Sequence, residues 1–105
     1  MSEPRRGEVW WVEVPGAGRR PALVLTRDIA IPLLNRITVA PATRTIRHIP
    51  TEVFLDEEDG MRAACVLSFD NLSVVPKAAL ESRITELGPA RMAQACGALA
   101  NAFGC

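Results

Sequence analysis

The sequence predicts a mainly β fold with one C-terminal helix, built as a small and strongly bent antiparallel barrel. Short apolar segments with the two-residue period of strands recur between residues 8 and 86, and only residues 89–103 change to helical spacing. The chain has 105 residues, of which 49% are hydrophobic, and this suits a single core. We therefore expect one domain over residues 1–105.

The first hairpin is predicted from alternation followed by a turn. In residues 8–14 (EVWWVEV) the side chains from Trp10 to Val14 at even positions face one way, and those from Val9 to Glu13 at odd positions face the other. Residues 15–18 (PGAG) form the loop. Residues 21–26 (PALVLT) are almost continuously apolar, which predicts a strand buried on both faces.

The remaining strands are short and separated by turn signals. We expect them at residues 37–41, 51–55, 65–69, 72–75 and 83–85. Residues 28–36 (DIAIPLLNR) form an unusually apolar loop that either packs back on the barrel or faces a partner. Residues 56–60 (DEEDG) predict a solvated acidic turn, and a helical turn is expected after Pro76.

The terminal helix is predicted over residues 89–103. Pro89 suits a first helical turn, and Gly104 suits the stop. The expected apolar stripe consists of Met92, Ala95, Cys96, Leu99, Ala102 and Phe103. It would cover one end of the barrel or form a seam between two copies of the chain.

The charges divide unevenly along a chain whose formal net charge is zero. Residues 1–50 hold eight arginines and four acids, a net +4, while residues 51–105 hold four bases and eight acids, a net −4. Arginine can grip a phosphate through two hydrogen bonds at once. The distribution fits either a polyanion site beside an acidic surface or an ordinary mixed surface.

Several classes of protein are disfavoured. No apolar run reaches the roughly 18 residues of a membrane helix, and residues 1–7 do not resemble a signal peptide. Cys65, Cys96 and Cys105 are odd in number and widely spaced, which suits reduced thiols in the cytosol. His48 is the single histidine, so we expect neither a metal site nor a cofactor; we interpret it as incidental, with acid–base catalysis as the alternative.

Three polar groups of residues are candidates for chemistry. Arg19 and Arg20 precede Pro21, which holds Arg20 in extended geometry at the mouth of a strand. Thr43, Arg44 and Arg47 leave the next strand, close to His48. Asp70 and Asn71 lie between two apolar strands. Each group also has an ordinary structural explanation, as a solvated arginine, a turn cap or a turn.

The order of these segments resembles the MazF/PemK toxins of bacterial toxin–antitoxin systems. RGEVWWV (residues 6–12) is similar to their opening strand, and RPALVLT (20–26) to the second. TVAPAT (38–43) is similar to the third strand and its exit loop. The likeness continues through residues 49–53 and 70–72 and into the terminal helix from Leu87, so it covers nearly the whole chain.

The resemblance implies a fold, an activity and partners. The fold would be the barrel shared with the gyrase poison CcdB, of the Src-homology-like type, working as a cytoplasmic homodimer. The activity would be sequence-selective, metal-independent cleavage of single-stranded RNA, as an mRNA interferase, with ribosomal or transfer RNA as the alternative targets. A cognate antitoxin with an acidic tail would neutralise it by covering the basic groove.

The resemblance also implies residue roles. Arg20 and Thr43 would be catalytic, and Asp70 and Asn71 would bind RNA. We expect Arg19, Arg44 and Arg47 to bind the RNA as well, through their positive charge. Many relatives carry a glutamate shortly before the arginine, whereas residues 15–19 here contain no acid. Trp10 and Trp11 are available for core packing, dimer contact or base stacking.

Two other functions remain open at this point. One is a non-catalytic poison that acts on a protein target as CcdB acts on gyrase, and the other is a module that only binds RNA. In the favoured function the 2′-hydroxyl of RNA attacks its neighbouring phosphate. Arg20 and Thr43 would stabilise the charge that develops on that phosphate.

Overall fold

The computed structural model describes residues 3–105 and confirms the predicted fold class. It contains β1 (Glu8–Val14), β2 (Gly18–Val24), β3 (Arg36–Thr43), β4 (Glu52–Leu55), β5 (Cys65–Ser68), β6 (Ser73–Pro76), β7 (Leu80–Glu86) and α1 (Pro89–Phe103). Single 3₁₀ turns lie at Ile31–Leu33, Glu57–Asp59, Phe69–Asn71 and Lys77–Ala79. No helix in the described chain is long and apolar enough to cross a membrane.

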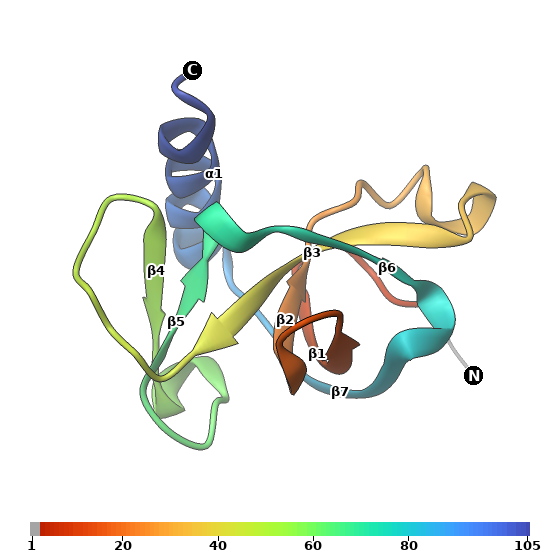
Figure 1. Cartoon of the computed structure of the whole chain (residues 1–105), viewed down its shortest axis with the longest axis horizontal. Helices are drawn as coiled ribbons and strands as arrows, with labels where there is room; N and C mark the ends of the chain where they lie inside the picture. Colours follow the sequence, from red (N-terminus) through yellow and green to blue (C-terminus); the bar gives the residue numbers. More distant parts are fainter. Residues whose placement is uncertain (1–2) are drawn as a thin grey trace.

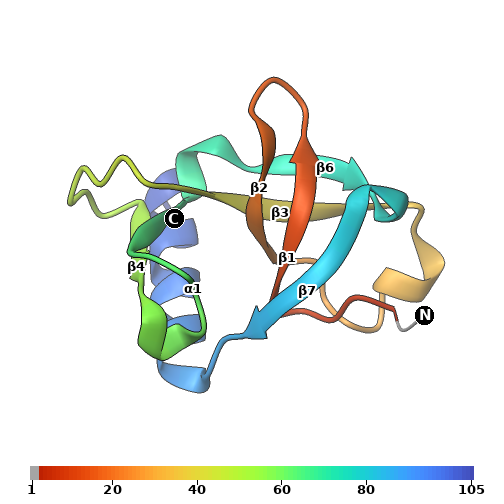
Figure 2. The ribbon, with the colours of Figure 1, turned by 90° about the horizontal axis from the view of Figure 1, so that it is seen from below.

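Strand β3 joins the two halves of the sheet. It pairs with β2 on one side and with β6 and then β5 along consecutive parts of its length, always antiparallel. Strand β1 lies between β2 and β7, and β4 extends the other end beyond β5. Figure 1 shows β3 running across the molecule with α1, β4 and β5 gathered at one end, and Figure 2 shows β1 and β2 crossing β3 nearer its middle.

The sheet is strongly bent but not closed. The strand order is β4-β5-β3-β2-β1-β7, and within residues 3–105 no pairing joins β4 to β7. The predicted strongly bent antiparallel barrel is thus confirmed, in an open form. Helix α1 packs against β4 and the turn at Phe69–Asn71, so it covers one side of the bend.

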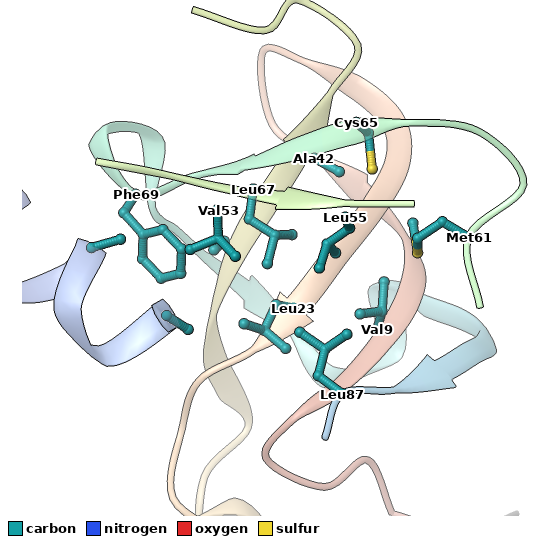
Figure 3. Packing of buried hydrophobic residues seen from close by; sticks show 13 residues of the cluster. Val9, Leu23, Ala42, Val53, Leu55, Met61, Cys65, Leu67, Phe69 and Leu87 are labelled. Atoms are coloured by element: carbon teal, nitrogen blue, oxygen red, sulfur yellow. The ribbon is translucent and has the colours of Figure 1, made fainter. Parts of the chain in front are cut away.

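Two hydrophobic clusters occupy opposite faces of the sheet, as the run at residues 21–26 predicts. Leu23 points into the cluster that also receives β4, β5 and α1, whereas Ala22 and Val24 point into the other. Figure 3 shows Leu23 facing Leu55 and Leu67 across the first cluster. Because β2 and β3 are covered on both sides, the strands that carry the candidate residues are rigidly held.

Some boundaries differ from the sequence prediction. Strand β2 begins at Gly18 instead of Pro21, because Arg19 and Arg20 pair with Glu13 and Val12 and extend the hairpin to its tight turn. Strand β7 is also longer than predicted, since it follows β1 over most of its length. These extensions place both arginines on a strand.

Two interpretations of the C-terminal half are partly wrong. The acidic turn is not simply solvated: Asp59 Oδ1 accepts a hydrogen bond of 3.0 Å from Arg91 Nε on α1. In α1 the fully buried residues are Ala95 and Ala98, flanked by half-buried Met92, Leu99 and Ala102. The predicted stripe members Cys96 and Phe103 are exposed.

Candidate active site

Arg20 is held by carbonyl groups alone. Its Nη2 donates to the Ala17 carbonyl at 2.7 Å, and its Nη1 donates to the Ala42 carbonyl at 3.3 Å. The first bond fixes the guanidinium to the end of the β1–β2 hairpin and the second fixes it to the end of β3. Within residues 3–105 no carboxylate pairs with it, so its positive charge is free to act on a ligand.

Thr43 lies at the last position of β3, directly after the carbonyl that holds Arg20. Its Oγ1 accepts a hydrogen bond of 3.2 Å from the Thr45 backbone nitrogen, which turns the exit loop. The hydroxyl proton is not engaged by this bond and can be donated. Thr43 and Arg20 are both half-buried, and both line the same two hollows.

Two hollows meet at Arg20 and Thr43. The Trp11 hollow, about 430 Å³, is lined by Trp11, Arg19, Arg20, Pro21, Ala42, Thr43, Arg44, Thr45, Met61, Arg62, Ala63, Cys65 and Ile84. The Asp70 hollow, about 520 Å³, is lined by Val14–Ala17, Arg20, Pro41–Thr43, Arg47, Ser68 and Asp70–Ser73. Arg20, Ala42 and Thr43 form their common wall. All seven residues singled out from the sequence line one or both hollows.

The Asp70 hollow is polar and its side chains are oriented by local hydrogen bonds. Asp70 Oδ2 accepts from the Thr51 hydroxyl at 2.6 Å, and Asn71 Nδ2 donates to Ser68 Oγ at 2.8 Å. Both residues belong to the 3₁₀ turn that joins β5 to β6. Because these two strands pair with consecutive parts of β3, the turn lies at the point where the partner of β3 changes.

The basic residues differ in what opposes their charge. Arg19 Nε donates to Glu81 Oε1 at 2.7 Å, and the guanidinium carbon lies 4.3 Å from the centre of the Trp11 ring. Arg47 lies 3.9 Å from Glu52, and its backbone nitrogen donates to that carboxylate. Arg44 forms no ion pair within the described residues.

Sequence reasoning missed four contributors to the hollows. Arg62 and Met61 reach the Trp11 hollow from the loop after β4, and Ser68 and Ser73 flank Asn71 in the other. Short-range patterns give no signal for Arg62, because only the fold brings it near Thr43. His48 is exposed with φ of 55° and lines neither hollow.

Cys65 forms part of the buried floor of the Trp11 hollow. Burial raises the pKa of its thiol above the ordinary 9.0, against a smaller opposing effect of the Arg44 charge. The thiol therefore stays protonated near neutral pH and behaves as a small apolar group. Together with Met61, it gives this hollow an apolar base beneath a charged rim.

Comparison with known proteins gives consistent matches across the chain. The family model of the PemK-like, MazF-like toxin of type II toxin–antitoxin systems matches residues 5–103. The probable endoribonuclease MazF5 of Mycobacterium tuberculosis is 44% identical over 97% of this chain and 94% of its own. The solved M. tuberculosis toxin MazF-mt6 is 33% identical with a TM-score of 0.86, covering 92% of this chain and 96% of the other. A mycobacterial endoribonuclease solved in complex with its cognate antitoxin is 29% identical with a TM-score of 0.86, covering 96% and 95%.

Proposed function

Because this chain belongs to the family of PemK-like, MazF-like toxins of type II toxin–antitoxin systems, we propose that Arg20 and Thr43 form the catalytic centre of its endoribonuclease activity. The chain is an RNA-cleaving toxin, and the two non-catalytic alternatives are not favoured. The observation that carries the assignment is the uncompensated Arg20 guanidinium beside the Thr43 hydroxyl at the wall between two hollows.

The reaction needs an in-line geometry and charge stabilisation. The ribose 2′-hydroxyl loses its proton and forms a bond to the adjacent phosphorus, while the bond from phosphorus to the 5′-oxygen of the next nucleotide breaks and that oxygen gains a proton. The products are a 2′,3′-cyclic phosphate and a free 5′-hydroxyl. Arg20 would hold the non-bridging oxygens by charge and paired donors, and Thr43 would donate a further hydrogen bond.

The other predicted residues would bind the RNA on either side of this phosphate. Arg44 is exposed and unpaired in the described chain, and it suits a neighbouring phosphate. Asp70 and Asn71 together present acceptors and donors, which suits the edge of an unpaired base. Arg47 would add charge at the mouth of the same hollow.

The family also suggests how the protein is used. One solved relative binds its cognate antitoxin, and we infer that an antitoxin with an acidic tail neutralises this chain by occupying the arginine-lined wall. We further propose a single-domain cytoplasmic protein that works as a homodimer. The exposed Ile29 and Leu33 of the 28–36 loop are available for such contacts, while Ile31 is buried against the sheet.

Cleavage of RNA in excess EDTA tests the proposal. Purified protein should cut single-stranded RNA without added metal and leave 2′,3′-cyclic phosphate or 3′-phosphate ends. Arg20→Ala and Thr43→Ala should each lower the rate about 10²–10³-fold while folding normally. Arg27→Ala, which removes an exposed arginine outside both hollows, is the matched control. Wild-type rates in either site variant would contradict the assignment.

A further inference from the structure

We propose that the Trp11 hollow is a subsite for one nucleobase beside the cleaved phosphate, with the Arg19 guanidinium plane as the surface on which that base stacks. This inference rests on the proposed function, since it takes the RNA to lie across Arg20 and Thr43. It assigns Arg19 and Trp11 to the selection of a base and not to the grip on a phosphate.

The first step is that the charges of two adjacent arginines are opposed by different groups. Arg20 meets only carbonyl oxygens, whereas Arg19 forms an ion pair of 2.7 Å with Glu81. A neutralised guanidinium attracts a phosphate weakly, but it keeps its flat π-system. Guanidinium planes are common stacking partners of unpaired bases in RNA recognition.

The second step is the rigidity of the plane. The Arg19 guanidinium carbon lies over the Trp11 ring, 4.3 Å from its centre, so the indole supports the guanidinium from one side. Glu81 on β7 and Trp11 on β1 therefore hold it from two neighbouring strands. The Arg19 side chain still keeps 51% of its surface exposed, which leaves a face for a ligand.

The third step is the chemistry of the hollow. Buried Met61, Cys65 and Ala42, together with half-buried Ile84, supply an apolar floor. Its volume of about 430 Å³ falls in the range of small-ligand sites. A sugar or a phosphate would gain little from this floor, whereas a nucleobase presents a flat apolar face to it.

The fourth step is the position of the hollow relative to the catalytic pair. Arg20 and Thr43 line both hollows, so a phosphate bound to them has a polar hollow on one side and the Trp11 hollow on the other. An RNA strand crossing this wall has one nucleotide on each side. The Asp70 hollow offers hydrogen-bonding groups to one base, and the Trp11 hollow offers a stacking surface to its neighbour.

Binding of uncleavable RNA tests the subsite separately from catalysis. A short RNA with 2′-fluoro sugars lacks the nucleophile, and an abasic nucleotide is moved through it one position at a time. In the wild-type protein we expect one position at which base removal weakens binding at least 10-fold. In Arg19→Ala and in Arg19→Lys, the penalty for the same removal should fall at least about threefold below the wild-type penalty, since the apolar floor remains and the guanidinium plane is lost. The lysine variant is the matched control, because it keeps the charge and loses the plane.

Two results would overturn the subsite. One is a loss of binding on base removal that is as large in Arg19→Lys as in the wild type. This would mean that the base depends on the positive charge and not on the guanidinium plane. The other is the absence of any position with a penalty above twofold. The proposed function is tested by cleavage of ordinary RNA by Arg20→Ala, so its failure is recognised independently of these binding ratios.

Discussion

At the scale of single residues, Arg20 has a donor that the fold leaves unmatched. Its Nε is buried and has no hydrogen-bond partner within residues 3–105. An unsatisfied buried donor costs about 1–3 kcal/mol. In the proposed catalytic role, a group held in this way lowers the stability of the protein in exchange for an uncompensated charge, as active sites commonly do.

This leads to a prediction for Arg20→Met, which fills the space of the arginine side chain as far as Nε but removes its charge and donors. Cleavage should fall about 10²–10³-fold. The free energy of unfolding should equal that of the wild type or exceed it by up to about 1 kcal/mol. Urea unfolding and an RNA cleavage assay measure the two effects, and a large loss of stability would show that Arg20 is a structural residue.

The Thr43 hydroxyl can be tested by comparing two substitutions. Thr43→Ser keeps the hydroxyl that receives the Thr45 backbone bond, and Thr43→Ala removes it. We expect the serine variant to cleave within about fivefold of the wild type and the alanine variant about 100-fold more slowly. Single-turnover cleavage rates check this, and equal rates for the two variants would rule out the hydroxyl.

His48 should be dispensable. It is exposed, lines neither hollow, and has φ of 55°, a conformation that asparagine adopts readily. His48→Asn should therefore preserve both folding and cleavage between pH 6 and 8. A hundredfold loss of cleavage would instead assign His48 an acid–base role.

At the scale of elements, the turn at Glu57–Asp59 is pinned between β7 and α1. The Thr85 hydroxyl donates to the Asp59 carbonyl at 2.9 Å, and Gly60 has φ of 96° with its α-carbon against Thr85. A methyl group on Gly60 would clash with the Thr85 side chain. Gly60→Ala should therefore lower the free energy of unfolding by about 2 kcal/mol or more.

Gly97 provides the matched opposite case. It lies within α1, and a methyl group there meets no atom within 4 Å. Gly97→Ala should stabilise the protein by up to about 1 kcal/mol through helix propensity. Thermal unfolding of both variants tests the pair, since only Gly60 is argued to be sterically confined.

The ion pair between Asp59 and Arg91 makes stability depend on pH. Burial of the Asp59 carboxyl acts to raise its pKa, but hydrogen bonds from Arg91 and the Asp56 backbone outweigh this and leave the pKa below 3.8. The contribution of this ion pair to the free energy of unfolding is thus fully present above pH 3.8. It is lost as the pH falls through the lower pKa that Asp59 has in the folded protein. Asp59→Asn should unfold about 1–2 kcal/mol more easily at pH 7, and this difference should shrink below pH 4. A constant difference would contradict the ion pair.

Sequence reasoning worked best where one local signal decides an element. The alternation in β1 and the Pro89 and Gly104 boundaries of α1 were predicted to the residue. It failed where the pairing of strands determines the bounds of an element. Arg19 and Arg20 join β2 only because β1 lies opposite them. All seven candidate residues line the two hollows. The ion pair that distinguishes Arg19 from Arg20 comes from Glu81, 62 positions away, and no local pattern shows it.

At the scale of the whole molecule, a net charge of zero is compatible with a small group of arginines that form no ion pair in the described chain. Arg20, Arg44 and Arg62 line the hollows without an ion pair in the described chain, while Arg19 and Arg47 are paired with acids. Each phosphate contact on a single strand contributes about 0.7 to the salt dependence of binding. We expect log K against log salt concentration to have a slope near −2, measured by titration. A slope steeper than about −3.5 would mean that the paired arginines also bind phosphates.

The antiparallel pairing of β1 with β7 also affects when, during synthesis, the protein becomes active. Glu8 in the first strand pairs with Glu86, 78 residues further along the chain. Such distant pairings slow folding, and ribosomes add only about 5–20 residues per second. Arg20 and Thr43 are made early, but the sheet that carries them is complete only after β7 has been made. The order of synthesis therefore separates the production of this chain from the onset of RNA cleavage.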